Sequence, residues 1–181
     1  MKKIIAIAAL AIVGYSANAQ NASSTATQTV NLALSNAIEL TFTGSGTATG
    51  SAVTLSFTTV NDYANGIESA AQQLKVRSNK AFGVTVKTNN ANFTYTGTTS
   101  PAPVMPVASV LDVKVSSNST GGTIAGTFGS YSVLSSTAQN LISNGTYGGN
   151  QLFSVMYKAT PGFAYPAGTY TVDVVYTATQ N

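Results

Sequence analysis

The chain has only five carboxylate side chains that could take part in acid–base chemistry, and it contains no histidine and no cysteine. This composition excludes Ser-His and Cys-His nucleophile systems and the usual zinc sites, which need imidazole or thiolate groups. Glycoside hydrolysis would need two carboxylates facing each other across a cleft, and the spacing predicts no such pair. The five are Glu39, Asp62, Glu68, Asp112 and Asp173. We therefore expect a protein that is not an enzyme and that binds no metal or cofactor.

Asp62 and Glu68 flank a stretch rich in turn-forming residues, among them Asn61, Asn65 and Gly66. Carboxylate and amide oxygens are the ligands that Ca²⁺ prefers, but the ligand spacing of an EF-hand loop is absent. Two interpretations stay open, a cation-binding loop and a capped turn. The sequence favours the capped turn.

Aromatic side chains are the other candidates for binding, because tyrosine in polar loops supplies contact area with little loss of entropy. Those in or near predicted loops are Tyr63, Tyr95, Tyr131, Tyr147, Phe163 and Tyr165. They would serve either as contacts for glycans or protein, or as covers for the ends of a core. Because prolines flank Phe163 and Tyr165, we expect these two to plug an end of the core.

The elements that must position these residues are strands, since apolar and polar residues alternate along most of the chain. The alternating sets lie at 30–34, 38–42, 53–57, 74–78, 82–86, 93–95, 110–115, 131–133, 152–157 and 169–179. Single helical turns are expected only at residues 68–73 and 138–142. Seven to nine short strands with turn residues between them predict an all-β fold, an immunoglobulin-like antiparallel β-sandwich.

The first nineteen residues have the pattern of a signal peptide. Lys2 and Lys3 precede an apolar run at 4–13, and Ala17-Asn18-Ala19 provides the small-residue cleavage site. We expect export and residues 20–181 as the mature chain. The apolar run is too short to span a bilayer as a helix, and no later run is longer, so no membrane insertion is expected.

Charge gives no sign of a nucleic-acid partner. The chain has eight basic and five acidic residues, and Lys2 and Lys3 are lost with the signal peptide. The nearly neutral remainder lacks the basic surface that nucleic acid or an anionic membrane attracts. Such a Thr-rich, weakly charged β protein is suited to packing against copies of itself.

Both ends of the mature chain carry alternating strands. Val30, Leu32 and Leu34 form one set, and the set at 169–179 ends with the chain. A terminal strand must pair with another strand or remain an adhesive edge. This combination predicts a subunit that polymerises through its strands.

Three features together resemble a known family. They are the alternating strand at 27–34, the Ser/Thr/Gly-rich body without cysteine, and the ending Pro166–Tyr170 followed by Val172, Val174 and Tyr176. In these the chain resembles the pilins, the major subunits of chaperone-usher fimbriae, and more closely their alternate, disulfide-free lineage. Gly168, fourteenth from the end, matches a glycine of pilin C-termini, whereas Gln180 stands where many pilins have tyrosine.

The resemblance implies a sandwich that lacks its last strand and is completed by a strand donated from the next copy. It divides the chain into a donor segment at 20–36 and a pilin-like domain at 37–181. The donor residues would be Val30, Leu32 and Leu34. The acceptor groove would be formed by Ile38, Leu40, Phe42, Tyr170, Val172, Val174 and Tyr176. The implied partners are copies of the chain itself, a periplasmic chaperone and an outer-membrane usher, and the implied product is an extracellular cell-surface filament that supports adhesion or biofilm formation.

The residues also allow another assembly of the same strands. Val30, Leu32 and Leu34 could form the first strand of a complete monomeric sandwich. The protein would then be a secreted or surface domain that binds glycans or protein through its tyrosine-rich loops. Only the pairing of the N-terminal strand separates the two alternatives.

Overall fold

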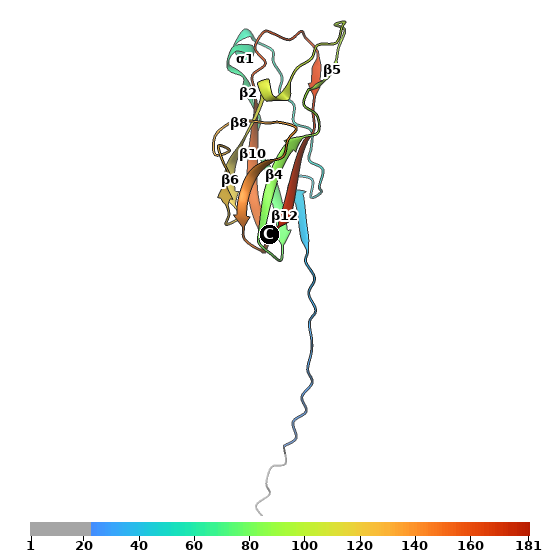
Figure 1. Ribbon diagram of the computed structural model, residues 1–181, viewed down its shortest axis with the longest axis vertical. Helices are drawn as coiled ribbons and strands as arrows, with labels where there is room; N and C mark the ends of the chain where they lie inside the picture. The colour runs from blue at the N-terminus through green and yellow to red at the C-terminus, as the bar shows by residue number, and fades with distance from the viewer. Residues whose placement is uncertain (1–22) are drawn as a thin grey trace, which may run out of the picture. The chain divides into compact units, whose positions relative to one another are not determined.

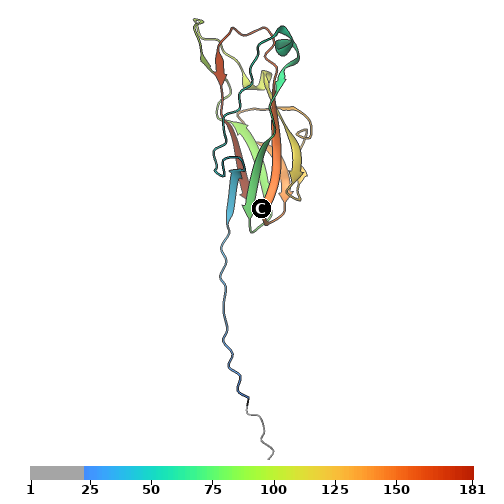
Figure 2. The same ribbon diagram turned by 180° about the vertical axis from the view of Figure 1, so that it is seen from behind.

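Two antiparallel sheets packed face to face form the framework of the chain between Ser35 and Asn181 (Figures 1 and 2). The structure is a computed structural model that describes residues 23–181, so the predicted signal peptide at 1–19 lies outside the described residues. Between Leu34 and Ser35 the chain divides into an N-terminal unit and a larger C-terminal unit.

The first main sheet has six strands in the order β1-β3-β10-β6-β8, with β2 paired to β10. Its strands are β1 (Ile38–Phe42), β2 (Ile67–Glu68), β3 (Gln72–Ser78), β6 (Leu111–Ser119), β8 (Ser132–Val133) and β10 (Gly148–Ala159). The second main sheet has the order β12-β4-β9-β7. Its strands are β4 (Phe82–Thr88), β7 (Thr123–Ile124), β9 (Gln139–Gly145) and β12 (Val174–Gln180).

Smaller elements lie outside the two main sheets. A two-stranded pair joins β5 (Thr94–Thr96) to β11 (Thr169–Thr171). Within residues 23–181 the helical segments are α1 (Val60–Asn65) and a 3₁₀ turn at Val107–Ser109.

The apolar core lies between the two main sheets because successive side chains of a strand point to opposite faces. In β4 the side chains of Phe82, Val84 and Val86 are fully buried, and in β3 those of Leu74 and Val76 are too. Both sets belong to one hydrophobic cluster. The fold is therefore mostly β and sandwich-like, as the alternating pattern predicts.

The described chain has twelve strands, more than the seven to nine predicted. Seven of the twelve have five or more residues, and these form the two main sheets together with short strands of two residues. The excess consists of strands of two or three residues, which are too short for sequence periodicity to detect.

The long strand predicted at 169–179 is wrong, because it is divided between two sheets. The chain leaves β11 at Thr171 and enters β12 at Val174. At the break, the Asn89 backbone N–H donates to the Asp173 carbonyl at 3.0 Å, and the Asn89 side-chain amide donates to the Asp173 carboxylate at 2.8 Å. Asn89 lies in a distant loop, so no local pattern announces the break.

The helical turn predicted at 138–142 is also wrong, since these residues enter β9. Leu141 and Ile142 are consecutive and both are buried. The register of β9 against β4 shifts here, with Ile142 opposite Val84 and Asn140 opposite Thr85. A β-bulge of this kind interrupts the period of two and imitates a helical pattern.

Two further sequence predictions are corrected in the region before β3. The turn predicted at 68–73 is extended, because Ser69 is bonded to β10: its N–H donates to the Tyr157 carbonyl at 2.8 Å, and its hydroxyl accepts from the Tyr157 N–H at 2.9 Å. The strand predicted at 53–57 is not formed. Leu55 and Phe57 pack against the core, but their backbone belongs to no ladder.

Candidate functional site

The end strands of the two main sheets, β1 and β12, lie next to each other along one side of the sandwich. The Phe42 ring contacts the Tyr176 ring edge-on at 6.2 Å, and the Gln180 side chain donates to the Ala37 carbonyl at 2.9 Å. The start of β1 therefore lies beside the end of β12, and the two strands run in opposite directions. Among residues 23–181, neither strand has a ladder partner on its outer edge.

A groove of about 350 Å³ opens between these two strands. It is lined by Leu40, Phe42, Ala48, Leu74 and the β12 residues 174–178. We call it the β1–β12 groove. Its walls are largely apolar, so an extended chain with alternating apolar side chains would match it chemically.

The groove is the place where the core reaches the surface. Leu40 and Phe42 stand opposite Val76 and Leu74 of β3, so they share the core face of that sheet. Val76 and Leu74 are fully buried, whereas Leu40 and Phe42 are only partly buried.

The same difference appears in the second sheet. Tyr176 and Ala178 stand opposite the fully buried Val86 and Val84, yet both are only partly buried. Both sheets thus present core-facing side chains that nothing else in the described chain covers.

Tyr176 is the tyrosine of β12 that lines the groove. Its hydroxyl lies 2.7 Å from the hydroxyl of Tyr157, and its ring also contacts Phe153 at 6.4 Å. Burial raises the pKa of Tyr157 to about 12 and, with the neighbouring Tyr157, raises the pKa of Tyr176 well above its ordinary value. Both hydroxyls are therefore neutral at physiological pH, and one donates to the other.

Of the seven acceptor residues expected from the sequence, the structure brings four to the groove: Leu40, Phe42, Val174 and Tyr176. Ile38 lies on the core face of β1 but is not among the lining residues. Tyr170 lies in the separate β5–β11 pair, where its ring packs on Tyr95 at 5.0 Å, and Val172 lies in the break before β12. The break at Asp173 is the reason that these two do not line the groove.

Sequence reasoning missed five lining residues, two of which, Val175 and Thr177, alternate with the expected residues of β12. Ala178 continues the alternation of Val174 and Tyr176 and could have been found from that pattern. Leu74 belongs to a predicted strand, but only the sheet order places it beside β1. Ala48 lies in a Gly- and Thr-rich loop, and its local sequence carries no signal.

The N-terminal unit carries three exposed aliphatic side chains. Val30, Leu32 and Leu34 have exposed fractions of 76%, 85% and 87%. The strand predicted for them is not formed in this structure, since residues 23–37 contain no helix, strand or turn. The N-terminal unit thus presents three large aliphatic side chains at alternate positions, all of them exposed.

The carboxylates are spread over the fold, and most of them have a hydrogen-bond or ion-pair partner. Glu68 accepts a hydrogen bond from the Tyr131 hydroxyl at 2.8 Å and lies near Lys114 and Lys158 at 4.0 and 3.9 Å. Glu39 pairs with Arg77 on the surface. Partial burial raises the pKa of Asp112. Within residues 23–181 no three His, Cys, Asp or Glu side chains gather as a metal site would require.

The predicted capped turn at Asp62 is confirmed. The Thr59 hydroxyl accepts from the Asp62 N–H at 3.3 Å, and the Asp62 carboxylate accepts from the Thr59 N–H at 2.7 Å. This reciprocal capping box begins α1. Backbone N–H groups of Thr58 and Thr59 bond the carboxylate and lower the pKa of Asp62 below its usual 3.8.

Replacement of Asp62 by Asn is expected to reduce the stability of the fold at neutral pH. The variant should then lose less stability than the wild type as the pH is lowered. A lowered pKa in the folded state stabilises the fold above the unfolded-state pKa, and this contribution is lost as pH falls through the folded-state pKa. Thermal unfolding between about pH 7 and about pH 2 checks this. D62N should melt below wild type at neutral pH, and the two curves should converge in acid.

The matched control is Glu39→Gln, which removes a carboxylate from an exposed ion pair with Arg77. Such surface pairs contribute little, so E39Q should stay close to wild type throughout. Curves for D62N and wild type that stay parallel down to the lowest pH would contradict the capping role.

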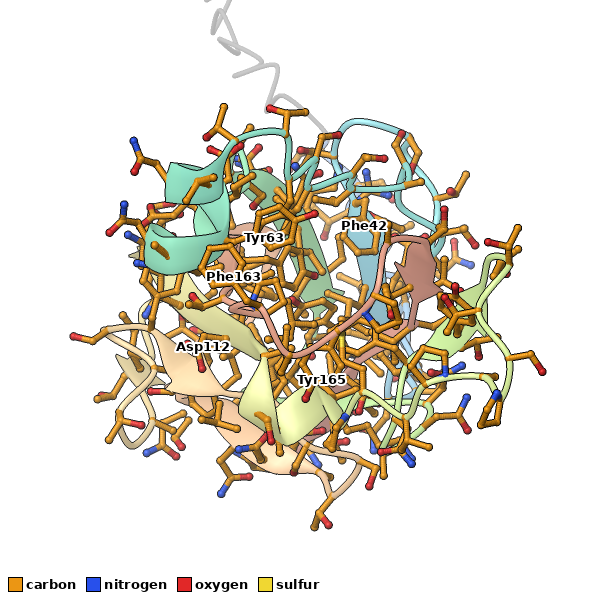
Figure 3. The ribbon with its side chains drawn as sticks, turned by 90° about the horizontal axis from the view of Figure 1, so that it is seen from above. Phe42, Tyr63, Asp112, Phe163 and Tyr165 are labelled. Carbon is orange, nitrogen blue, oxygen red and sulfur yellow. The ribbon has the colours of Figure 1, made fainter. Side chains whose placement is uncertain are left out.

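Phe163 does not plug the core as expected from the sequence. Its ring is 69% exposed and stacks on the Tyr63 ring at 5.6 Å, and Tyr63 in turn contacts Phe57 at 5.4 Å. Figure 3 shows Tyr63 and Phe163 next to each other above the sandwich. Tyr165, by contrast, is partly buried against the core, as predicted.

No helix in the described part of the chain is both long and apolar enough to cross a membrane. The chain matches no protein-family model, and no curated protein sequence matches it. The candidate site therefore rests on its geometry and on the sequence resemblance.

Proposed function

We propose that this protein is a structural subunit of a cell-surface filament and that its copies join head to tail by strand donation. Residues 26–34 of one copy would complete the β1–β12 groove of another. The observation that supports this most directly is that core-facing side chains of both β1 and β12 are only half-buried, while Val30, Leu32 and Leu34 of the same chain are exposed.

The two surfaces match in spacing. Val174, Tyr176 and Ala178 follow one another at every second residue along the groove. Val30, Leu32 and Leu34 have the same period, which in an extended chain is about 6.8 Å. A donated strand could therefore present one aliphatic side chain at each of the half-buried positions, and its backbone could bond the open edge of β1 or β12.

Burial of the donor side chains would supply part of the energy of the joint. Burying three aliphatic side chains gives roughly 5 to 9 kcal/mol before the cost of association is subtracted. Added ladder hydrogen bonds and slow unfolding of the joint would extend its lifetime. Because donor and acceptor are different surfaces, each addition leaves a free donor and a free groove, and the assembly grows as a filament.

The resemblance to chaperone-usher pilins supplies the remaining parts of the proposal. The sandwich would be of the immunoglobulin-like kind, without catalytic activity, and exported through the segment at 1–19. A periplasmic chaperone would cover the groove before assembly, and an outer-membrane usher would add subunits. The alternative, a monomeric glycan- or protein-binding domain, leaves both the open groove and the exposed aliphatic residues unexplained.

The absence of cysteine allows a direct test by introduced disulfides. Asn31 is next to Leu32, the middle donor residue, and Thr177 is an exposed residue near the middle of β12. When purified N31C and T177C proteins are mixed under oxidising conditions, we expect a disulfide-linked dimer on a non-reducing gel. Because both positions lie near the middle of their segments, the test depends little on the direction in which the strand enters.

The matched control is Thr123→Cys, an exposed threonine on β7 at the opposite edge of the same sheet. N31C mixed with T123C should give only background dimer. Equal cross-linking at Thr177 and Thr123 would contradict strand donation and would favour the monomeric alternative.

A further inference from the structure

The short link between the N-terminal unit and β1 is held by two side chains. The Asn79 amide donates to the Ser35 carbonyl at 2.7 Å, and its oxygen accepts from the Ala37 N–H at 2.9 Å. The Gln180 amide donates to the Ala37 carbonyl at 2.9 Å and to the Asn79 side-chain oxygen at 3.0 Å. We call this arrangement the Asn79–Gln180 clasp.

The clasp closes one end of the β1–β12 groove. Asn79 follows β3, and Gln180 is the last residue of β12, so the clasp ties the start of β1 to the end of β12. The Asn79 N–H also donates to the Ala37 carbonyl at 3.2 Å, which continues the β1–β3 ladder by one residue. The backbone from Ser35 to Ala37 is thus committed to an extended path in line with β1.

We propose that the Asn79–Gln180 clasp selects the partner of the groove: it prevents a chain from filling its own groove and so reserves the groove for a second copy. This inference rests on the proposed function. The donor residues stand only a few positions before β1, and a chain that completed itself would have no site left for assembly.

The chain's own donor residues cannot insert parallel to β1, because the link between them and β1 is too short. To seat all three donor residues in that direction, Leu34 must lie near the Phe42 end of the groove. Ala37 is held at the other end, about 17 Å away along the strand. The link from Leu34 to Ala37 spans at most about 11 Å when fully extended.

Insertion antiparallel to β1 would need a hairpin, and the loop length decides which side chains face the core. A two-residue loop at Ser35-Asn36 places Leu34 opposite Ala37 and Leu32 opposite Glu39. That register turns the aliphatic side chains to the outer face, where Glu39 pairs with Arg77. The easiest hairpin therefore leaves the groove unfilled.

A three-residue loop at 35–37 is the shortest that gives the productive register. It places Leu34 opposite Ile38, Leu32 opposite Leu40 and Val30 opposite Phe42, on the core face. Such a loop must release Ser35 and Ala37 from every bond that the clasp makes. Loops of this length also favour a left-handed third residue, which disfavours Ala37. The next productive loop, of five residues, would in addition dissolve the start of β1.

The test follows self-insertion with a disulfide reporter. In the three-residue register Ala33 stands opposite Glu39, so A33C/E39C is expected to close a disulfide within one chain only when that chain fills its own groove. With the clasp intact, we expect assembly and mainly interchain disulfides. In the N79A/Q180A background, the ratio of intrachain to interchain disulfide is expected to rise about tenfold or more, because several hydrogen bonds that oppose the loop are lost. Non-reducing gels and size-exclusion chromatography with light scattering measure both quantities.

The matched control is Asn89→Ala, which removes a comparable loop asparagine that bonds Asp173 away from the link. N89A should leave the disulfide ratio unchanged. Circular dichroism and thermal melting verify folding, and if N79A/Q180A does not fold, Q180A alone is compared and a smaller rise is expected.

The outcomes separate the two proposals. Normal assembly of N79A/Q180A with no rise in intrachain disulfide would overturn the role of the clasp and leave strand donation standing. If the reporter protein with an intact clasp neither assembles nor forms interchain disulfides, strand donation itself fails, and the inference about the clasp fails with it.

Discussion

Leu32→Asp is expected to abolish filament formation while leaving the sandwich as stable as in the wild type. Leu32 is the middle donor residue, and its insertion would place a carboxylate in a largely apolar groove that Leu40, Phe42 and Tyr176 line. Burial of an unpaired charge costs far more than the roughly 5 to 9 kcal/mol that the three aliphatic side chains supply. Because the Leu32 side chain is exposed in the structure, the substitution removes no contact from the folded body. Electron microscopy of the purified protein and light scattering check the loss of assembly.

Asn31→Asp is the control for this substitution. It introduces the same charge one residue earlier, at a position that faces away from the groove in a donated strand, because neighbouring side chains point to opposite faces. N31D should assemble nearly as wild type, and both variants should melt at the wild-type temperature in their unassembled form. Filaments of L32D at wild-type abundance would refute the role of Leu32.

A peptide of residues 26–36 is expected to bind full-length L32D and to raise its melting temperature. L32D keeps an intact groove but has no functional donor of its own, so the added peptide meets no competitor. At a peptide concentration about one hundred times the dissociation constant, the stabilisation is about 2.7 kcal/mol. For a domain of this size that corresponds to a rise of roughly 6 to 10 °C, measurable by calorimetry.

The control peptide has the same composition without the alternation. Val30 exchanges places with Asn31, and Leu34 exchanges places with Ala33, so that the three aliphatic side chains become consecutive. Because successive side chains of a strand point to opposite faces, this peptide cannot turn all three of them toward the groove. An equal rise with both peptides would show that binding does not depend on the alternation, and no rise with either would count against strand donation.

Where the period of two is strict, the sequence predicts strands well. β4, β6 and β10 appear where Val- and Phe-rich alternation predicts them, because each buries one face against the opposite sheet. The prediction is wrong where a distant residue intervenes. Asn89 bonds Asp173 and divides the final strand, and the bulge at Leu141 gives β9 a helix-like pattern.

The candidate site was predictable to a similar degree. The alternation of Leu40 with Phe42 and of Val174 with Tyr176 identifies side chains that face a core. The alternation does not show that these strands lie at the edges of their sheets, since an edge strand and a central strand can have the same pattern. The clasp gives no signal at all in the sequence, because Asn79 in a turn and Gln180 in a strand become a unit only when β1 and β12 meet.

The sequence by itself determined the chemistry of this protein: an almost uncharged β chain without imidazole or thiol, with an apolar alternating segment near its N-terminus. These are properties of composition and of local period, which do not depend on which strands pair. Only the tertiary structure decided that β1 and β12 lie at the open side of the sandwich and that Ser35–Ala37 is held there. Strand order and edge position arise from contacts between residues far apart in the chain, and it is these contacts that turn partly covered side chains into a groove.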